Sequence, residues 1–154
     1  MLMQNFKPAH ELSLNAAQYD ALCKTLVLLE TGKITHIKTD PELKSCWSLD
    51  KNNEFSGHFN MRYWGGLIGS HYYRRGYECG TISCIGGLAE LVAGKPVFHN
   101  GSSTYNPDTL HYLFNPSCIP VTQWDEITTE QAAQALRNFL TTGRPNWKEI
   151  VNGR

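Results

Sequence analysis

The stretch that decides the fold is Thr81-Ile-Ser-Cys-Ile-Gly-Gly-Leu-Ala-Glu-Leu-Val-Ala93. Its apolar residues Ile85, Leu88 and Val92 recur at three- and four-residue spacing, which is the period of one helix face. The pair Gly86-Gly87 costs about 1 kcal/mol per residue relative to alanine inside a helix, so its presence indicates that another element approaches closely there. We therefore predict a helix over this stretch, at the centre of the core.

Two further helices are predicted, one before and one after this stretch. Asn15, followed three residues later by Gln18, has the pattern of a capping box and opens a helix over about residues 16–30. Ile127-Thr-Thr-Glu-Gln131 is a second capping box, and a glycine and a proline follow the apolar pattern that it opens. The residues of this last helix predicted to face inward are Leu136, Phe139 and Leu140.

Shorter elements are expected between these helices. The stretch 34–37 alternates apolar and polar residues, which is typical of a strand. Residues 97–105 contain the turn dipeptide Asn100-Gly101 and predict a β-hairpin, after which Asn106-Pro107-Asp108 has the composition of a helix start. Residues 47–80 show no sustained period and are interpreted as a long, aromatic-rich loop region, whose length indicates either a function or a concealed element.

Composition places these elements in one folded unit. The chain has 154 residues, of which 41% are hydrophobic, with 14 Lys and Arg against 14 Asp and Glu. We predict a single mainly helical α+β domain over residues 1–154, with the helix over 81–93 flanked by the other two and the hairpin at one edge. Balanced charge argues against bulk nucleic-acid binding, and no apolar run approaches the length of a membrane span. We expect a cytoplasmic protein without a cofactor and without a membrane partner.

Two motifs carry a resemblance to a known group of proteins. Phe59-Asn-Met-x-x-Trp64 is followed by Cys79-Gly-Thr-x-x-Cys84-Ile-Gly-Gly-x-Ala89, and the likeness extends over roughly residues 55–147. This pattern resembles a group of small bacterial and phage proteins with no assigned activity. Leu88 stands where some members of the group carry a polar side chain. The resemblance implies a shared fold unit and a phage or mobile-element origin, but it transfers no catalytic residue.

Cys84 is the candidate nucleophile. If Thr81 or Ser83 caps the helix, Cys84 lies in its first turn, where unpaired N–H groups favour the thiolate and lower the thiol pKa. A cysteine nucleophile also needs a base, and the candidates are His99 and His111. The alternative is that Cys84 is a small buried apolar residue, as most unpaired cysteines are.

The pair of Cys79 and Cys84 leaves three arrangements open. The chain has five cysteines, an odd number that favours reduced thiols over a disulfide framework. The two could still form a disulfide, pack separately, or bind a metal, although structural zinc usually needs a second close pair that this chain lacks. The other residues weighed as metal ligands are Cys118, His71, His99 and His111.

The stretch 71–77 alternates aromatic rings with two arginines, and tyrosine and arginine dominate binding hot spots. The leading functional hypothesis is therefore a non-enzymatic interaction protein with an unidentified protein partner, using residues 57–77 as its surface. A cysteine-dependent hydrolase or transferase is the second hypothesis and a small zinc module the third. The alternative for the aromatic stretch is a loop whose tyrosines pack on the core. The residues proposed for binding are Tyr72, Tyr73, Arg74, Arg75, Tyr77 and Trp64.

Overall fold

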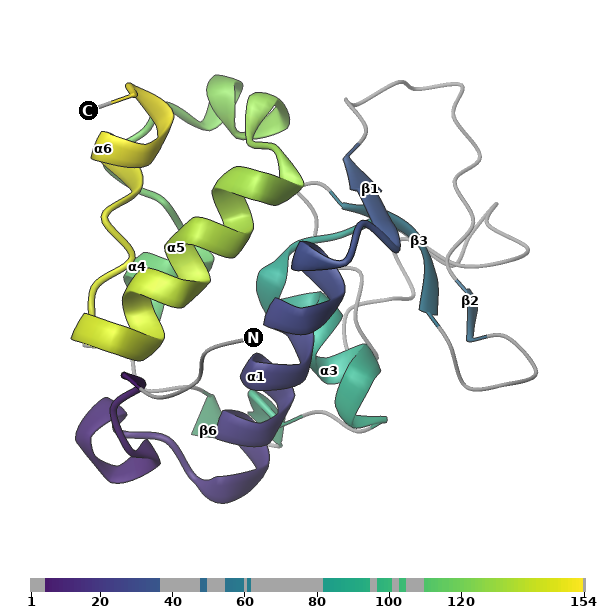
Figure 1. Ribbon diagram of the computed structural model, residues 1–154, viewed down its shortest axis with the longest axis vertical. Helices are drawn as coiled ribbons and strands as arrows, with labels where there is room; N and C mark the ends of the chain where they lie inside the picture. Colours follow the sequence, from purple (N-terminus) through teal and green to yellow (C-terminus); the bar gives the residue numbers. More distant parts are fainter. Residues whose placement is uncertain are drawn as a thin grey trace.

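The computed structural model describes residues 5–36, 48–49, 55–59, 61, 82–94, 97–100, 103–104 and 110–153, and the chain is mainly helical (Figure 1). The helices are α1 Ala16–Glu30, α3 Ile85–Ala93, α4 His111–Phe114, α5 Thr129–Thr142 and α6 Trp147–Val151, with 3-10 helices η1 Ala9–Leu12 and η2 Val121–Glu126. The strands are β1 Ile34–His36, β2 Ser48–Leu49, β3 Phe55–Phe59, β4 Ile82–Ser83, β5 His99–Asn100 and β6 Ser103–Thr104. Each helix in these ranges is too short or too polar to cross a membrane.

Helix α1 begins at the predicted capping box. The backbone N–H of Gln18 donates to Asn15 Oδ1 at 2.8 Å, and the Asn15 N–H donates to Gln18 Oε1 at 3.1 Å. Two otherwise unpaired donors are thereby satisfied. Gly32 follows the helix with φ of +74°, a conformation that glycine adopts without strain. The prediction of a helix over residues 16–30 is confirmed.

Helix α5 also begins as predicted. The Gln131 N–H donates to Thr128 Oγ1 at 3.1 Å, and the Thr128 N–H donates to Gln131 Oε1 at 2.9 Å. Gly143 ends the helix with φ of +86°. The three residues predicted to face inward are fully buried, which confirms the apolar face read from the sequence: Leu136, Phe139 and Leu140.

Helix α3 begins later than predicted. Ser83 belongs to β4, and Cys84 occupies the N-cap position with φ of −82° and ψ of −177°. The expectation that Ser83 caps the helix is therefore wrong, and Thr81 lies outside the described residues. Because the chain reaches the helix directly from a strand, the extended backbone continues through Cys84 and helical geometry starts at Ile85.

The order of the helices also differs from the prediction. Helix α1, not α3, lies in the middle, because it packs against both α3 and α5, while α3 and α5 share little contact (Figure 1). The glycine pair of α3 is buried, as a close contact requires. The central position belongs to α1 because it carries buried residues along most of its length. These residues are Ala21, Leu22, Cys23, Thr25, Leu26 and Leu29.

A small sheet lies beside the helices, on the right in Figure 1. Strand β3 pairs in parallel with β1, with Ile34 opposite Gly57, and in parallel with β4, with His58 opposite Ile82. Strand β2 pairs with β3 in antiparallel fashion. The sequence interpretation of residues 47–80 as a loop region missed β3, because Phe55-Ser-Gly-His-Phe59 is short and contains a central glycine that weakens strand propensity. Its two parallel partners, β1 and β4, are distant in the sequence.

Several shorter segments complete the described structure. Strands β5 and β6 pair in antiparallel fashion, with His99 opposite Thr104, and the turn predicted between them lies outside the described residues. The predicted strand at residues 34–37 is present as β1. Helix α4 begins at His111, and the start expected at residues 106–108 lies outside the described residues. Helix α6 was not predicted, because Pro145 closely precedes it.

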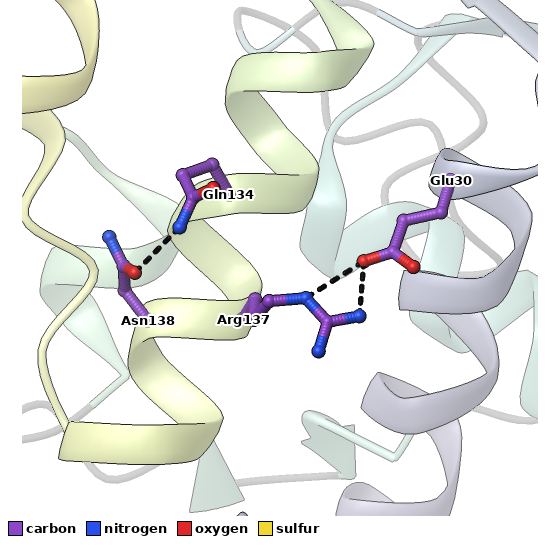
Figure 2. A network of polar contacts seen from close by, with 4 residues as sticks. All are labelled: Glu30, Gln134, Arg137 and Asn138. Carbon is purple, nitrogen blue, oxygen red and sulfur yellow. Dashed lines mark hydrogen bonds and ion pairs between the residues drawn. The ribbon is translucent and has the colours of Figure 1, made fainter. Parts of the chain in front are cut away.

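Polar contacts fix α5 against α1 (Figure 2). Arg137 Nε on α5 donates to Glu30 Oε1 on α1 at 3.0 Å, and the Arg137 guanidinium lies over the Phe6 ring, 5.6 Å from its centroid. On the same helix, Gln134 Nε2 donates to Asn138 Oδ1 at 2.8 Å. Both members of the ion pair are about one-third exposed, so we expect a contribution of at most about 1 kcal/mol, with apolar burial as the main source of stability.

Candidate functional site

Cys84 lies in the core, with 2% of its surface exposed. Burial raises the pKa of its thiol from 9.0 to about 11 and outweighs the hydrogen bonds from backbone N–H groups, those of Gly87 and Gly86 first, which lower the pKa. The lowered pKa expected for a nucleophilic Cys84 is therefore wrong, and the alternative, a small buried apolar residue, is confirmed. The favourable start of a helix is present, yet the loss of hydration disfavours the thiolate more strongly.

The two imidazoles proposed as bases lie on the predicted elements. His99 is in β5, although its side chain is not described, and His111 is the first residue of α4. The His111 ring packs edge-on against Tyr112, with ring centroids 5.6 Å apart. Among the described contacts, no hydrogen bond joins His111 to Cys84, and the pairing of these two residues stays a prediction.

The sequence interpretation overlooked a buried carboxylate near Cys84. Glu90 is fully buried, and its Oε2 accepts a hydrogen bond from the Phe98 N–H at 3.2 Å. Its negative charge also raises the pKa of Cys84. Gln18 Nε2 on α1 donates to the Val97 carbonyl at 3.0 Å, so α1 and α3 together hold the segment that leads to β5. The signal for this buried carboxylate in the sequence was Glu90 itself, the single acidic residue of the otherwise apolar α3.

Only part of the metal-binding set considered from the sequence lies within the described residues. Within the described ranges, no three His, Cys, Asp or Glu side chains gather as metal ligands would, and Cys84, Cys118 and His111 all belong to those ranges. Cys84 is a reduced thiol, so the disulfide arrangement is wrong, whereas the metal arrangement stays untested. The remaining member of both arrangements, Cys79, lies outside the described residues.

Most of the proposed interaction surface over residues 57–77 lies outside the described residues. All of its candidate binding residues, and His71 beside them, belong to the undescribed range 62–81. They remain predictions from the sequence: Trp64, Tyr72, Tyr73, Arg74, Arg75 and Tyr77.

A groove of about 440 Å³ is lined by α4 with the residues that follow it, and by the segment that leads into α6. Tyr112 and residues 116–118 line one part of it, and residues 143–149 line the other. Seven of its eleven lining residues are exposed, so a ligand bound here would keep one face in water. The exposed Cys118, which was weighed as a metal ligand from the sequence, lines this groove.

The segment between α5 and α6 is held rigidly by side chains of α5. Asn138 Nδ2 donates to the Pro145 carbonyl at 3.1 Å, and the Arg144 N–H donates to Thr142 Oγ1 at 3.1 Å. Asn146 then takes a φ of +58°, an uncommon value outside glycine that asparagine tolerates best. These contacts fix the wall of the groove before any ligand arrives.

A buried tryptophan anchors the same wall to α4. Trp147 is 2% exposed, and its Nε1 donates to the Leu113 carbonyl at 3.2 Å. Tyr112, one residue earlier on α4, is 56% exposed; among the described residues, Val27 is the other exposed large apolar side chain. The groove therefore combines an immobile base with an exposed aromatic ring.

Positively charged side chains outnumber negatively charged ones at the groove. Arg144 and Lys148 carry positive charge and Glu149 carries negative charge, and all three are exposed. Ion pairs between described residues include Lys24 with Asp20 and Arg137 with Glu30. Neither groove cation forms an ion pair with a described residue. The site was not predicted, because Gly143 and Pro145 indicate only the end of a helix in the sequence.

Comparisons of the chain with models of protein families, with curated proteins and with solved structures found no match.

Proposed function

We propose that this protein is a non-enzymatic interaction protein that binds a segment of a partner protein in the groove formed by Tyr112, residues 116–118 and residues 143–149. The exposed Tyr112 ring beside a rigid groove wall carries this proposal. Tyrosine and arginine are enriched in binding hot spots, and this groove contains one of each. In this proposal the chain is a single α+β domain of phage or mobile-element origin.

The properties of Cys84 support an interaction role over thiol catalysis. With a pKa of about 11, roughly one Cys84 thiol in ten thousand is ionised at pH 7. A nucleophile must also reach its substrate, and Cys84 is buried. The aromatic stretch within residues 57–77 remains part of the proposal as a second interaction surface.

Cys118 provides a test because its exposed thiol can carry a steric block within the groove. Peptides are selected from a displayed random library on the immobilised protein, and their binding is then measured with Cys118 modified by a bulky maleimide. We expect the modification to abolish binding of most selected peptides. Selected peptides that bind equally well to the modified protein would overturn the groove as the docking site.

The matched control for this experiment is the Cys118→Ser variant treated with the same reagent. It should bind the selected peptides equally well before and after treatment with the reagent, since it has no thiol at position 118 to carry the block. Loss of binding in the treated variant would assign the block to another cysteine and would contradict the proposal.

A further inference from the structure

The cations of the groove specify the chemistry of its partner. Arg144 lies in the segment between α5 and α6, and Lys148 lies four residues later on α6. Both line the groove, and neither forms an ion pair with a described residue. A partner that brings carboxylates to these two side chains would form charge-assisted hydrogen bonds, which are stronger than neutral ones.

The apolar part of the groove lies beside these charges. The exposed Tyr112 ring offers a flat surface, and the prolines at positions 116 and 145 are buried and therefore fixed. An apolar side chain of the partner can cover the tyrosine ring while a neighbouring carboxylate meets Arg144 or Lys148. Aromatic rings next to an arginine are a frequent combination at binding hot spots.

We propose that the groove binds an extended, acidic segment of a partner protein, with at least one apolar side chain on Tyr112 and carboxylates at Arg144 and Lys148. This inference rests on the proposed function and adds the class of partner to it. The exposure of the groove to solvent favours a peptide over a small anion, since small-molecule sites usually enclose most of the ligand. Glu149 also favours a peptide. An extended chain can place its carboxylates away from the Glu149 carboxylate, whereas a compact, highly charged anion cannot.

The test compares matched peptides in fluorescence anisotropy. Fluorescein-labelled peptides from the displayed library are measured beside versions in which every Asp and Glu is replaced by Asn or Gln. We expect the selected peptides to be enriched in acidic residues next to an apolar one. We expect the amide versions to bind about tenfold more weakly or worse at low salt, and the difference to shrink as salt screens the charges.

Charge-reversal variants assign this effect to the groove. Arg144→Glu and Lys148→Glu should each weaken binding of the acidic peptide severalfold or more, while Lys24→Glu on α1 should leave it unchanged. Thermal melts of each variant verify folding, and the salt dependence of the unaltered protein supplies the same information if a variant does not fold. Equal binding to the charge-reversal variants and the unaltered protein would overturn the assignment.

Failure of this inference can be distinguished from failure of the proposed function. Peptides that the Cys118 modification blocks, but that bind as well in amide form, would overturn the acidic partner and leave the groove as a docking site. The absence of any peptide blocked by the modification would overturn both. Stronger displacement of the peptide by inorganic phosphate than by chloride at equal ionic strength would show a small-anion site and would also overturn the inference.

Discussion

Cys84 and Cys118 are two thiols of one chain in opposite surroundings. Cys84 sits at the start of α3, where the helix favours a thiolate, yet it is buried and its pKa is raised to about 11. Cys118 is exposed on the groove. A helix start typically contributes 0.3–1 kcal/mol to a nearby charge, whereas a raised pKa of two units corresponds to about 3 kcal/mol against it. Burial therefore decides the chemistry of a thiol before helix position does.

The largest expected effect is the difference in reactivity between these two thiols. Cys118 should react with iodoacetamide at neutral pH about a thousandfold faster than Cys84, or more, because Cys84 is both buried and ionised at only a small fraction. Mass spectrometry of timed digests measures both rates in one sample. Comparable rates would place Cys84 within reach of solvent and return the thiol-enzyme hypothesis to consideration.

The next effect concerns the rigidity of the groove. Trp147→Ala should lower the free energy of unfolding by about 3–5 kcal/mol, since it removes a buried ring and the hydrogen bond to the Leu113 carbonyl. Chemical denaturation measures the change. A loss below about 1 kcal/mol would mean that the wall of the groove is not anchored in the core, and the groove would then not be preformed.

The pH dependence of stability sharpens the comparison from the side of Cys84. Folding raises the pKa of this thiol from 9.0 to about 11, so the folded state keeps its proton to higher pH than the unfolded chain. The contribution of Cys84 is complete below pH 9 and is lost as the pH rises from 9 towards 11, by up to about 3 kcal/mol.

The control for this pH dependence is the Cys84→Ala variant. Tyr19 and Cys23 also have pKa values raised by burial, so their ionisation likewise lowers the stability of the folded protein as the pH rises. The difference between the two proteins isolates Cys84. If denaturation curves at pH 8 and pH 10.5 shift equally in both, Cys84 is not a buried neutral thiol.

A smaller effect is expected from the tight packing next to Cys84. Gly87 is buried in the first turns of α3, and Gly87→Leu should destabilise the protein by roughly 1–3 kcal/mol or more through overpacking. The midpoint of thermal unfolding measures it. An unchanged midpoint would place this face of α3 in solvent, in conflict with its burial here.

The helices, on the one hand, and the surroundings of Cys84 and Cys118, on the other, differ in how far the sequence predicted them. Helices α1 and α5 were predicted with their caps because Asn15 with Gln18, and Thr128 with Gln131, are local signals. Burial of Cys84 was weighed only from its residue type, because the elements that cover it are far along the chain and give no local signal. The groove was missed because it joins residues 112–118 to residues 143–149, and only the folded chain brings them together.

The smallest effect on stability is expected at Tyr112, and it separates binding from folding. Tyr112 is 56% exposed, so Tyr112→Ala should change the free energy of unfolding by about 0.5 kcal/mol or less. The same change should weaken binding of the library-selected peptides about tenfold or more, because the ring supplies the exposed apolar contact of the groove. Trp147 lines the same groove but is buried. Trp147→Ala should therefore have the larger effect on stability, and Tyr112→Ala the larger effect on binding. If Tyr112→Ala costs as much stability as Trp147→Ala, the Tyr112 ring belongs to the core, and the groove has no exposed hot spot to offer a partner.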